Sequence, residues 1–130
     1  MEKQPELDLP HYLSPKTNNE RLLNYQYAFK VNGDKRALDE MYRLGKEIAY
    51  KYVNVYAAEN KNVRRLSPEA RQEKAHNAIT YIVARYFKVN GWAIKKSFTA
   101  YIYLRVKHEL FYKRKVDDIV DFVDLEEIRR

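Results

Sequence analysis

Residues 34–55 read DKRALDEMYRLGKEIAYKYVNV, and apolar side chains recur there at every third or fourth position. The recurring positions are Ala37, Leu38, Met41, Leu44, Ile48, Tyr52 and Val55. An α-helix turns once in 3.6 residues, so this spacing predicts one long amphipathic helix, with Asp34 as its N-cap. Gly45 costs about 1 kcal/mol relative to alanine inside a helix, which indicates that another helix packs closely there. The polar run Glu59–Arg65 is expected to be a loop.

A shorter helix is expected before this one. An N-cap at Asn18 or Asn19 begins it, and it continues to about Lys30. The pair Asn32-Gly33 then ends it, because glycine readily takes the left-handed conformation that closes a helix. Its apolar positions at helical spacing are Leu22, Tyr25 and Phe29.

Two more helices are expected in the second half of the chain. Ser67-Pro68-Glu69 supplies a capping hydroxyl, a proline at the first helical position and an acid, and predicts a helix to about Tyr86. A basic loop, Lys88–Lys96, turns at Asn90-Gly91 and leads to a helix capped by Ser97. We expect these two helices to lie antiparallel or steeply crossed. The residues expected among the buried ones include Tyr42, Ile48, Ile79, Ile82 and Phe98.

The chain is therefore expected to be all-α, with no strand alternation of useful length. Residues 1–17 contain three of the four prolines and are expected to form an extended or disordered arm. Residues 18–115 form the domain of four main helices. Residues 116–130 form an acidic tail or a short last helix, which begins at Asp117 or Asp118.

Composition excludes several classes of protein. The 130 residues suit one domain, and no apolar run approaches the ~20 residues that span a membrane. The acidic N-terminus lacks the apolar core of a secretory signal, and there is no cysteine, so a cytoplasmic protein is expected. The three histidines lack ligand spacing, and no phosphate loop, carboxylate pair or nucleophile-histidine set is found. We expect no enzyme activity, no cofactor and no metal site.

The net charge of +7 is unevenly distributed. Residues 85–115 carry nine bases and one acid, whereas residues 116–130 carry two bases and six acids. Concentrated positive charge of this kind is typical of proteins that bind polyanions. The basic residues of 21–84 are more scattered, and a solvated helix surface accounts for them.

The basic segment is also rich in aromatic rings. Residues 97–115 read SFTAYIYLRVKHELFYKRK, and one helix cannot bury all of these side chains. Exposed rings beside cations suit stacking on unpaired bases, so Tyr101 and Tyr103, and also Trp92, are candidate stacking residues. The candidate phosphate contacts are Lys95, Lys96, Arg105, Lys107, Lys113, Arg114 and Lys115.

Two stretches resemble region 2 of bacterial RNA polymerase sigma factors. Residues 22–52, LLNYQYAFKVNGDKRALDEMYRLGKEIAYKY, are similar to its first half, with a short helix, a Gly-Asp turn and a long helix. Residues 84–110, ARYFKVNGWAIKKSFTAYIYLRVKHEL, are similar to its second half, typified by FSTYAYWWIR. The positions that match this pattern in register are Phe98, Thr99, Tyr101, Tyr103, Val106 and Lys107.

The resemblance implies that the chain binds promoter DNA and RNA polymerase core. Polymerase core would contact the third helix at Gln72, Glu73 and His76, where family members carry an acidic run and this chain has QEKAHN. The two family tryptophans that wedge the duplex are Leu104 and Arg105 here, and no helix-turn-helix region is expected in residues 116–130. The resemblance therefore implies a reduced sigma factor, of the kind that a phage or mobile element carries.

Three functions remain open from the sequence. The first is a sigma-like transcription factor that binds DNA and RNA polymerase. The second is a DNA-binding regulator that does not bind polymerase. The third is a phage interaction module whose basic surface meets an acidic protein partner.

Overall fold

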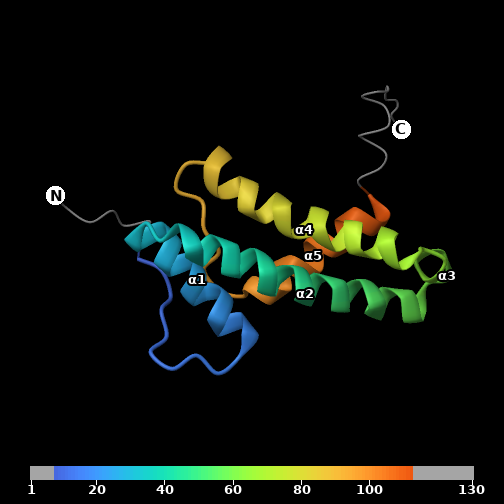
Figure 1. The fold of residues 1–130 in the computed structure, drawn as a ribbon, viewed down its shortest axis with the longest axis horizontal. Helices are drawn as coiled ribbons and strands as arrows, with labels where there is room; N and C mark the ends of the chain where they lie inside the picture. The colour runs from blue at the N-terminus through green and yellow to red at the C-terminus, as the bar shows by residue number, and fades with distance from the viewer. Residues whose placement is uncertain (1–7, 113–130) are drawn as a thin grey trace.

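Residues 8–112 of the chain are described by a computed structural model, and they form five α-helices and no strand (Figure 1). The helices are α1 (Asn18–Asn32), α2 (Lys35–Glu59), α3 (Lys61–Arg64), α4 (Pro68–Lys88) and α5 (Phe98–Phe111). The prediction of an all-α fold is confirmed. No helix within these residues has both the length and the apolar character needed to cross a bilayer.

The long helix predicted from residues 34–55 is the element around which the others pack. The helix α2 contacts α1, α3, α4 and α5, and it extends to Glu59. Gly45 allows the close approach that the sequence predicted, because a methyl group there would collide with the Ile79 side chain of α4. The central position of α2 therefore depends on a residue without a side chain at its contact with α4.

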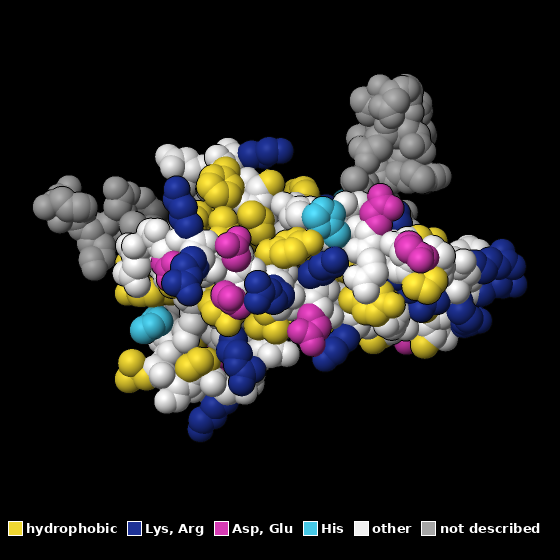
Figure 2. Space-filling view, in the orientation of Figure 1, with side chains coloured by type: hydrophobic (Ala, Val, Ile, Leu, Met, Phe, Trp, Pro, Cys, Tyr) yellow, Lys and Arg dark blue, Asp and Glu magenta, His cyan; other side chains and the backbone are white. Residues whose placement is uncertain are grey.

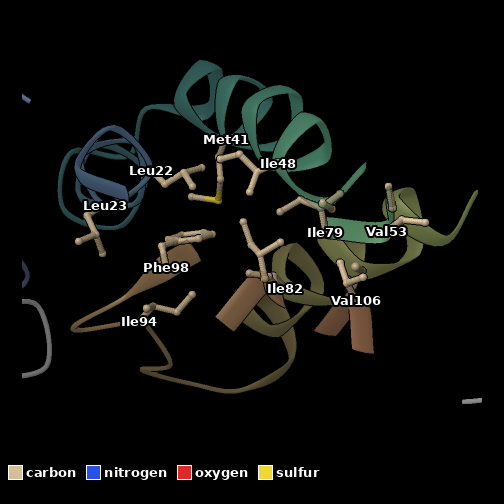
Figure 3. Close-up of a cluster of buried hydrophobic side chains, with 14 of the residues drawn as sticks. Leu22, Leu23, Met41, Ile48, Val53, Ile79, Ile82, Ile94, Phe98 and Val106 are labelled. Atoms are coloured by element: carbon tan, nitrogen blue, oxygen red, sulfur yellow. The ribbon is translucent and has the colours of Figure 1, made fainter. Parts of the chain in front are cut away.

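The core lies between α1, α2, α4 and α5, where apolar side chains from all four helices meet (Figure 3). Its fully buried members include Leu22, Leu23, Met41, Val53, Ile79, Ile82, Phe98, Ile102 and Val106. Burial is confirmed for Ile48, Ile79, Ile82 and Phe98, but Tyr42 is only half-buried. The Tyr42 hydroxyl reaches the α4 surface and is hydrogen bonded to Nδ1 of His76 at 2.7 Å.

The inward side of α2 turns gradually along the helix. It passes from Met41 through Ala49 to Val53 and Ala57, whereas Val55 is 47% exposed. Val55 follows the three-four spacing seen in the sequence but lies outside this buried strip. A fixed three-four spacing does not predict a buried strip that turns around the helix in this way.

Side-chain caps fix most of the helix starts at the predicted residues. Asp34, Ser67 and Ser97 each accept a hydrogen bond from a backbone N–H in the first turn of the following helix. The cap of α1 is Thr17, which accepts from the N–H of Glu20. The prediction of Asn18 or Asn19 as this cap is wrong, and the side chain of Asn19 has a different role, described below.

The polar run Glu59–Arg65 is not a loop. Glu59 still belongs to α2, and the Asn60 side chain accepts from the N–H groups of Asn62 and Val63 to start the single turn α3. Burial of Val63, which is 3% exposed, holds this turn against the core. The single apolar residue of this polar run, Val63, together with the Asn60 cap, therefore accounts for a helical turn where a loop was expected.

The arm before α1 is ordered against that helix over the residues described. Residues 8–17 form no helix or strand, and Leu9 is buried. Tyr12 and Asn24 exchange two hydrogen bonds, of 2.7 and 2.8 Å, between backbone and amide side chain. Residues 1–7 and 113–130, including the last helix expected from Asp117 or Asp118, lie outside the described residues.

Candidate nucleic-acid interface

The predicted binding residues lie on α5 and on the loop before it. Lys95 and Lys96 are exposed on the loop, Lys107 is exposed on α5, and Arg105 is half-buried. Lys113, Arg114 and Lys115 lie outside the described residues. In Figure 1 this loop lies at the end of the molecule opposite α3, where α1 also lies.

A buried glutamine of α1 holds the loop in place. Gln26 is fully buried, and its Nε2 donates to the carbonyl of Ile94 at 2.7 Å. Its Oε1 accepts from the N–H of Ile94 at 2.8 Å and from the hydroxyl of Tyr86 at 2.7 Å. One side chain thus satisfies both backbone groups of a buried loop residue and ties α4 to α1.

Asn19 of α1 positions the start of α5. Its Oδ1 accepts hydrogen bonds from the N–H groups of Phe98 at 2.6 Å and Thr99 at 3.1 Å. Free N–H groups at a helix start need such acceptors, so Asn19 acts as a cap from another helix. Sequence reasoning assigned this asparagine to its own helix, since no local pattern reveals a cap about 80 residues away.

The outward surface of α5 contains no carboxylate. Glu109 is the single acid of α5, and it is only 3% exposed. No other acid occurs between Lys74 and Tyr112. Over the α2 surface, by contrast, Figure 2 shows acidic side chains interspersed among basic ones. Positive charge on α5 and its loop is therefore much less compensated than on α2.

Two arginines lie on aromatic rings beside α5. The Arg105 guanidinium carbon is 3.5 Å from the centroid of the Tyr81 ring, and that of Arg85 is 5.3 Å from the centroid of Trp92. Tyr101 completes the group, with its ring centroid 5.7 Å from that of Trp92. These five residues, Tyr81, Arg85, Trp92, Tyr101 and Arg105, are called the arginine–aromatic cluster below.

The arginines of this cluster have no acidic partner within residues 8–112. The ion pair found in that part of the chain joins Arg43 to Glu40 on α2. The Nε atoms of Arg85 and Arg105 are both buried without a hydrogen-bond acceptor. Arg85 also donates from Nη1 to the Tyr81 hydroxyl at 3.4 Å. Both guanidinium groups keep their positive charge and further N–H donors for an anionic ligand.

Tyr101 is less exposed than its predicted stacking role requires. It is half-buried, and burial raises the pKa of its hydroxyl, with Tyr81 adding to the rise and Arg85 and Arg105 opposing it. Its ring packs against Trp92, while Tyr81 keeps 37% of its surface exposed. Tyr81 and Arg85 were not identified from the sequence, although they lie four residues apart on α4 and so share a side of that helix.

Tyr103 lies on the opposite flank of α5 from Tyr101. It is 38% exposed, and its ring stacks on Tyr56 with centroids 5.2 Å apart and meets Tyr52 edge-on. Burial, followed by the neighbouring Tyr103 hydroxyl, raises the pKa of Tyr56. The two tyrosines expected to stack on bases are therefore on different sides of α5, because a difference of two residues turns a helix by about 200°.

The predicted polymerase contacts lie on the first half of α4. Gln72, Glu73 and His76 are all exposed there. Gln72 borders a shallow groove of about 480 Å³ between α2 and α4, and the other residues that line it are Tyr42, Arg43, Lys46, Glu47, Tyr50 and Lys51. Tyr81, the nearest cluster residue on α4, follows His76 by five positions, which is about 7.5 Å along the helix and about 140° around it, so these residues form a second surface.

Comparisons with models of known protein families, with curated proteins and with solved structures find no match for this chain. The resemblance to sigma factor region 2 accordingly stays a prediction based on its two motif-bearing stretches. Within residues 8–112 no group of three or more histidine, aspartate or glutamate side chains could hold a metal ion. The chemistry that the described surface offers is positive charge beside aromatic rings.

Proposed function

We propose that this chain is a sigma-like DNA-binding transcription factor whose arginine–aromatic cluster binds unpaired or promoter-type DNA. The observation that carries the proposal is the pair Arg85 and Arg105, held on aromatic rings with no carboxylate partner among the described residues. Arginine binds phosphate in a planar, bidentate geometry and also stacks on bases, so a fixed guanidinium suits nucleic acid in particular.

Exposed lysines on the loop and on the outward side of α5 supply a second component of binding. Lys95, Lys96 and Lys107 are exposed and belong to a part of the chain without exposed acids. Their contacts with phosphates displace counterions and depend steeply on salt, with little regard for sequence. These lysines are expected to give affinity for any DNA.

The aromatic residues favour unpaired bases. Tyr81 is partly exposed, and Trp92 and Tyr101 are half-buried around the two guanidinium groups. Stacking of a base on an aromatic ring contributes about 1–3 kcal/mol, and it requires a base that is not enclosed in a duplex. Single-stranded or bubble DNA should therefore bind more tightly than duplex DNA.

Contact with RNA polymerase core is a further part of the proposal, through Gln72, Glu73 and His76. A DNA-binding regulator that does not bind polymerase is the second candidate, because this surface of α4 carries one acid where sigma factors carry several. A protein-interaction module that uses its basic surface is the third. Capture of bacterial polymerase core by the immobilised chain separates the first candidate from the second.

Fluorescence anisotropy over a salt series tests the DNA part of the proposal. Labelled single-stranded, bubble and duplex oligonucleotides of one sequence are titrated with the wild-type chain. We expect affinity to fall linearly with the logarithm of salt concentration and to be highest for the two unpaired forms. Equal, salt-independent binding of all three forms would exclude this mode of recognition.

A further inference from the structure

A shallow, open cavity lies on the flank of α5 opposite the arginine–aromatic cluster. It has a volume of about 340 Å³ and is bordered by α1, α2 and the start of α5. Its lining contains one cation and no acid, and consists of Thr17, Asn18, Asn19, Ile48, Lys51, Tyr52 and Thr99. The ammonium group of Lys51, with the amide and hydroxyl groups beside it, can bind an anion.

Lys51 supplies the positive charge of this cavity. Its side chain is exposed, and Glu47, one turn earlier on α2, forms no ion pair with it in the described structure. The backbone N–H groups at the nearby helix starts are already used, since Thr17 accepts from Glu20 and Asn19 accepts from Phe98 and Thr99. Side chains, and Lys51 above all, would therefore bind the anion.

An aromatic surface adjoins the same cavity. Tyr52 borders the cavity, and its ring meets that of Tyr103 edge-on with centroids 5.1 Å apart. Tyr103 in turn stacks on Tyr56 and keeps 38% of its surface exposed. A phosphate site beside a partly exposed tyrosine repeats, on this flank, the pairing of charge and ring found in the arginine–aromatic cluster.

The outward side of α5 connects the two flanks. Ala100, Leu104 and Lys107 are exposed there, and no acid interrupts them. A helix with its side chains is about 10–12 Å across, a distance that a strand of a few nucleotides can cover. An extended strand could thus touch both flanks at once.

We infer that a single strand of DNA crosses the outward side of α5, with bases at the arginine–aromatic cluster and a backbone phosphate in the Lys51 cavity. This inference rests on the proposed function, because it extends the same site from one flank of α5 to the other. It assigns Lys51, Tyr52 and Thr99 to DNA binding.

The test compares oligonucleotides of two lengths. Lys51→Gln removes the charge of an exposed residue and leaves the core intact. Single strands of about 12 nucleotides should bind this variant several-fold more weakly, with a salt slope lower by about one phosphate contact. Strands of about four nucleotides, long enough for the cluster alone, should bind it as they bind the wild type.

Lys35→Gln is the matched control, since Lys35 is an exposed lysine at the start of α2 and does not border the cavity. The inference is overturned if the two variants weaken 12-nucleotide binding equally, or if Lys51→Gln affects both lengths alike. It is supported only if Lys51→Gln, and not Lys35→Gln, lowers the affinity for the 12-nucleotide strand while the affinity for the four-nucleotide strand is unchanged. A wild type that binds neither strand rejects the proposed function as well, so the two failures can be told apart.

Discussion

At Arg105 the shape of the side chain matters as well as its positive charge. Its guanidinium lies 3.5 Å from the centre of the Tyr81 ring, a position that a planar cation adopts readily. A lysine keeps the charge but cannot present several donors in one plane. We expect Arg105→Lys to weaken single-stranded DNA binding about three- to tenfold, as measured by anisotropy at fixed salt. Lys107→Arg, a change at an exposed position without a ring beneath it, should leave affinity within about twofold.

Replacement of Gln26 on α1 should destabilise its contacts with the loop before α5 and with α4. Gln26→Ala removes three hydrogen bonds and leaves the buried N–H and carbonyl of Ile94 without their partners. Each unsatisfied buried group costs about 1–3 kcal/mol, so a loss of 2–4 kcal/mol in unfolding free energy is expected. Urea unfolding measures it. Asn24→Ala on the same helix, where the partners belong to the exposed arm, should cost clearly less.

Tyr86 should make the fold sensitive to alkaline pH. Burial first, and then Tyr101, raises its pKa above the ordinary value of 10.0. Above pH 10 the unfolded chain loses this proton while the folded chain keeps it, so stability is complete below pH 10 and falls as pH rises. One such group contributes a decline of up to about 1.4 kcal/mol per pH unit.

Urea unfolding of the wild type and of Tyr86→Phe between pH 8 and pH 11 measures this contribution. The variant should show a constant offset from its lost hydrogen bond to Gln26, and a shallower decline above pH 10. Parallel stability curves across the whole range would contradict the assignment to Tyr86.

At the scale of the helices, the contact between α2 and α4 depends on Gly45. Alanine is the better helix former by about 1 kcal/mol, yet its methyl group would meet the side chain of Ile79, which is fully buried. Overpacking of a filled core costs about 1–3 kcal/mol, so we expect Gly45→Ala to lower the free energy of unfolding by about 1 kcal/mol.

A double-mutant cycle tests whether the collision with Ile79 causes this loss of stability. Ile79→Val removes the terminal methyl that lies nearest to the added group. In that background Gly45→Ala should become neutral or stabilising, because helix propensity then acts without the collision. Equal effects of Gly45→Ala in both backgrounds would place the cause elsewhere.

The helices themselves were largely predictable from the sequence. Their starts were signalled by Asp34, Ser67 and Ser97, and Asn32-Gly33 marked the end of α1, because capping and turn chemistry depends on neighbours within a few residues. The failures involve partners distant along the chain. Asn19 caps a helix about 80 residues later, and Gln26 bonds to Ile94.

For the molecule as a whole, the sequence located the basic segment but not the arrangement of its side chains. Local composition was enough to identify Lys95, Lys96, Arg105 and Lys107 as candidates. The sequence analysis treated Tyr101 and Tyr103 alike as stacking residues and left out Tyr81 and Arg85, because it considered a single helix without its neighbours. The cluster exists only because α4, the loop and α5 meet.

The proposal that α4 carries a polymerase-binding surface also belongs to the whole molecule. The nearest residues of the two proposed surfaces, His76 and Tyr81, are about 7.5 Å apart along α4 and about 140° apart around it, so we expect that each surface can be mutated without loss of the other. Glu73→Lys should reduce capture of polymerase core while leaving single-stranded DNA affinity within about twofold. Capture that is unchanged by Glu73→Lys, with DNA binding intact, would favour a regulator that acts without polymerase.

The central claim is that the arginine–aromatic cluster binds DNA, and charge-matched double variants test it most directly. Anisotropy over a salt series compares Arg85→Gln/Arg105→Gln with Lys35→Gln/Arg36→Gln, which removes the same charge from an exposed stretch of α2. The cluster variant should bind single-stranded DNA at least tenfold more weakly, with a flatter salt dependence, and the α2 variant should lose no more than about twofold. Equal losses in the two variants, or a wild type without salt-dependent binding, would contradict the claim.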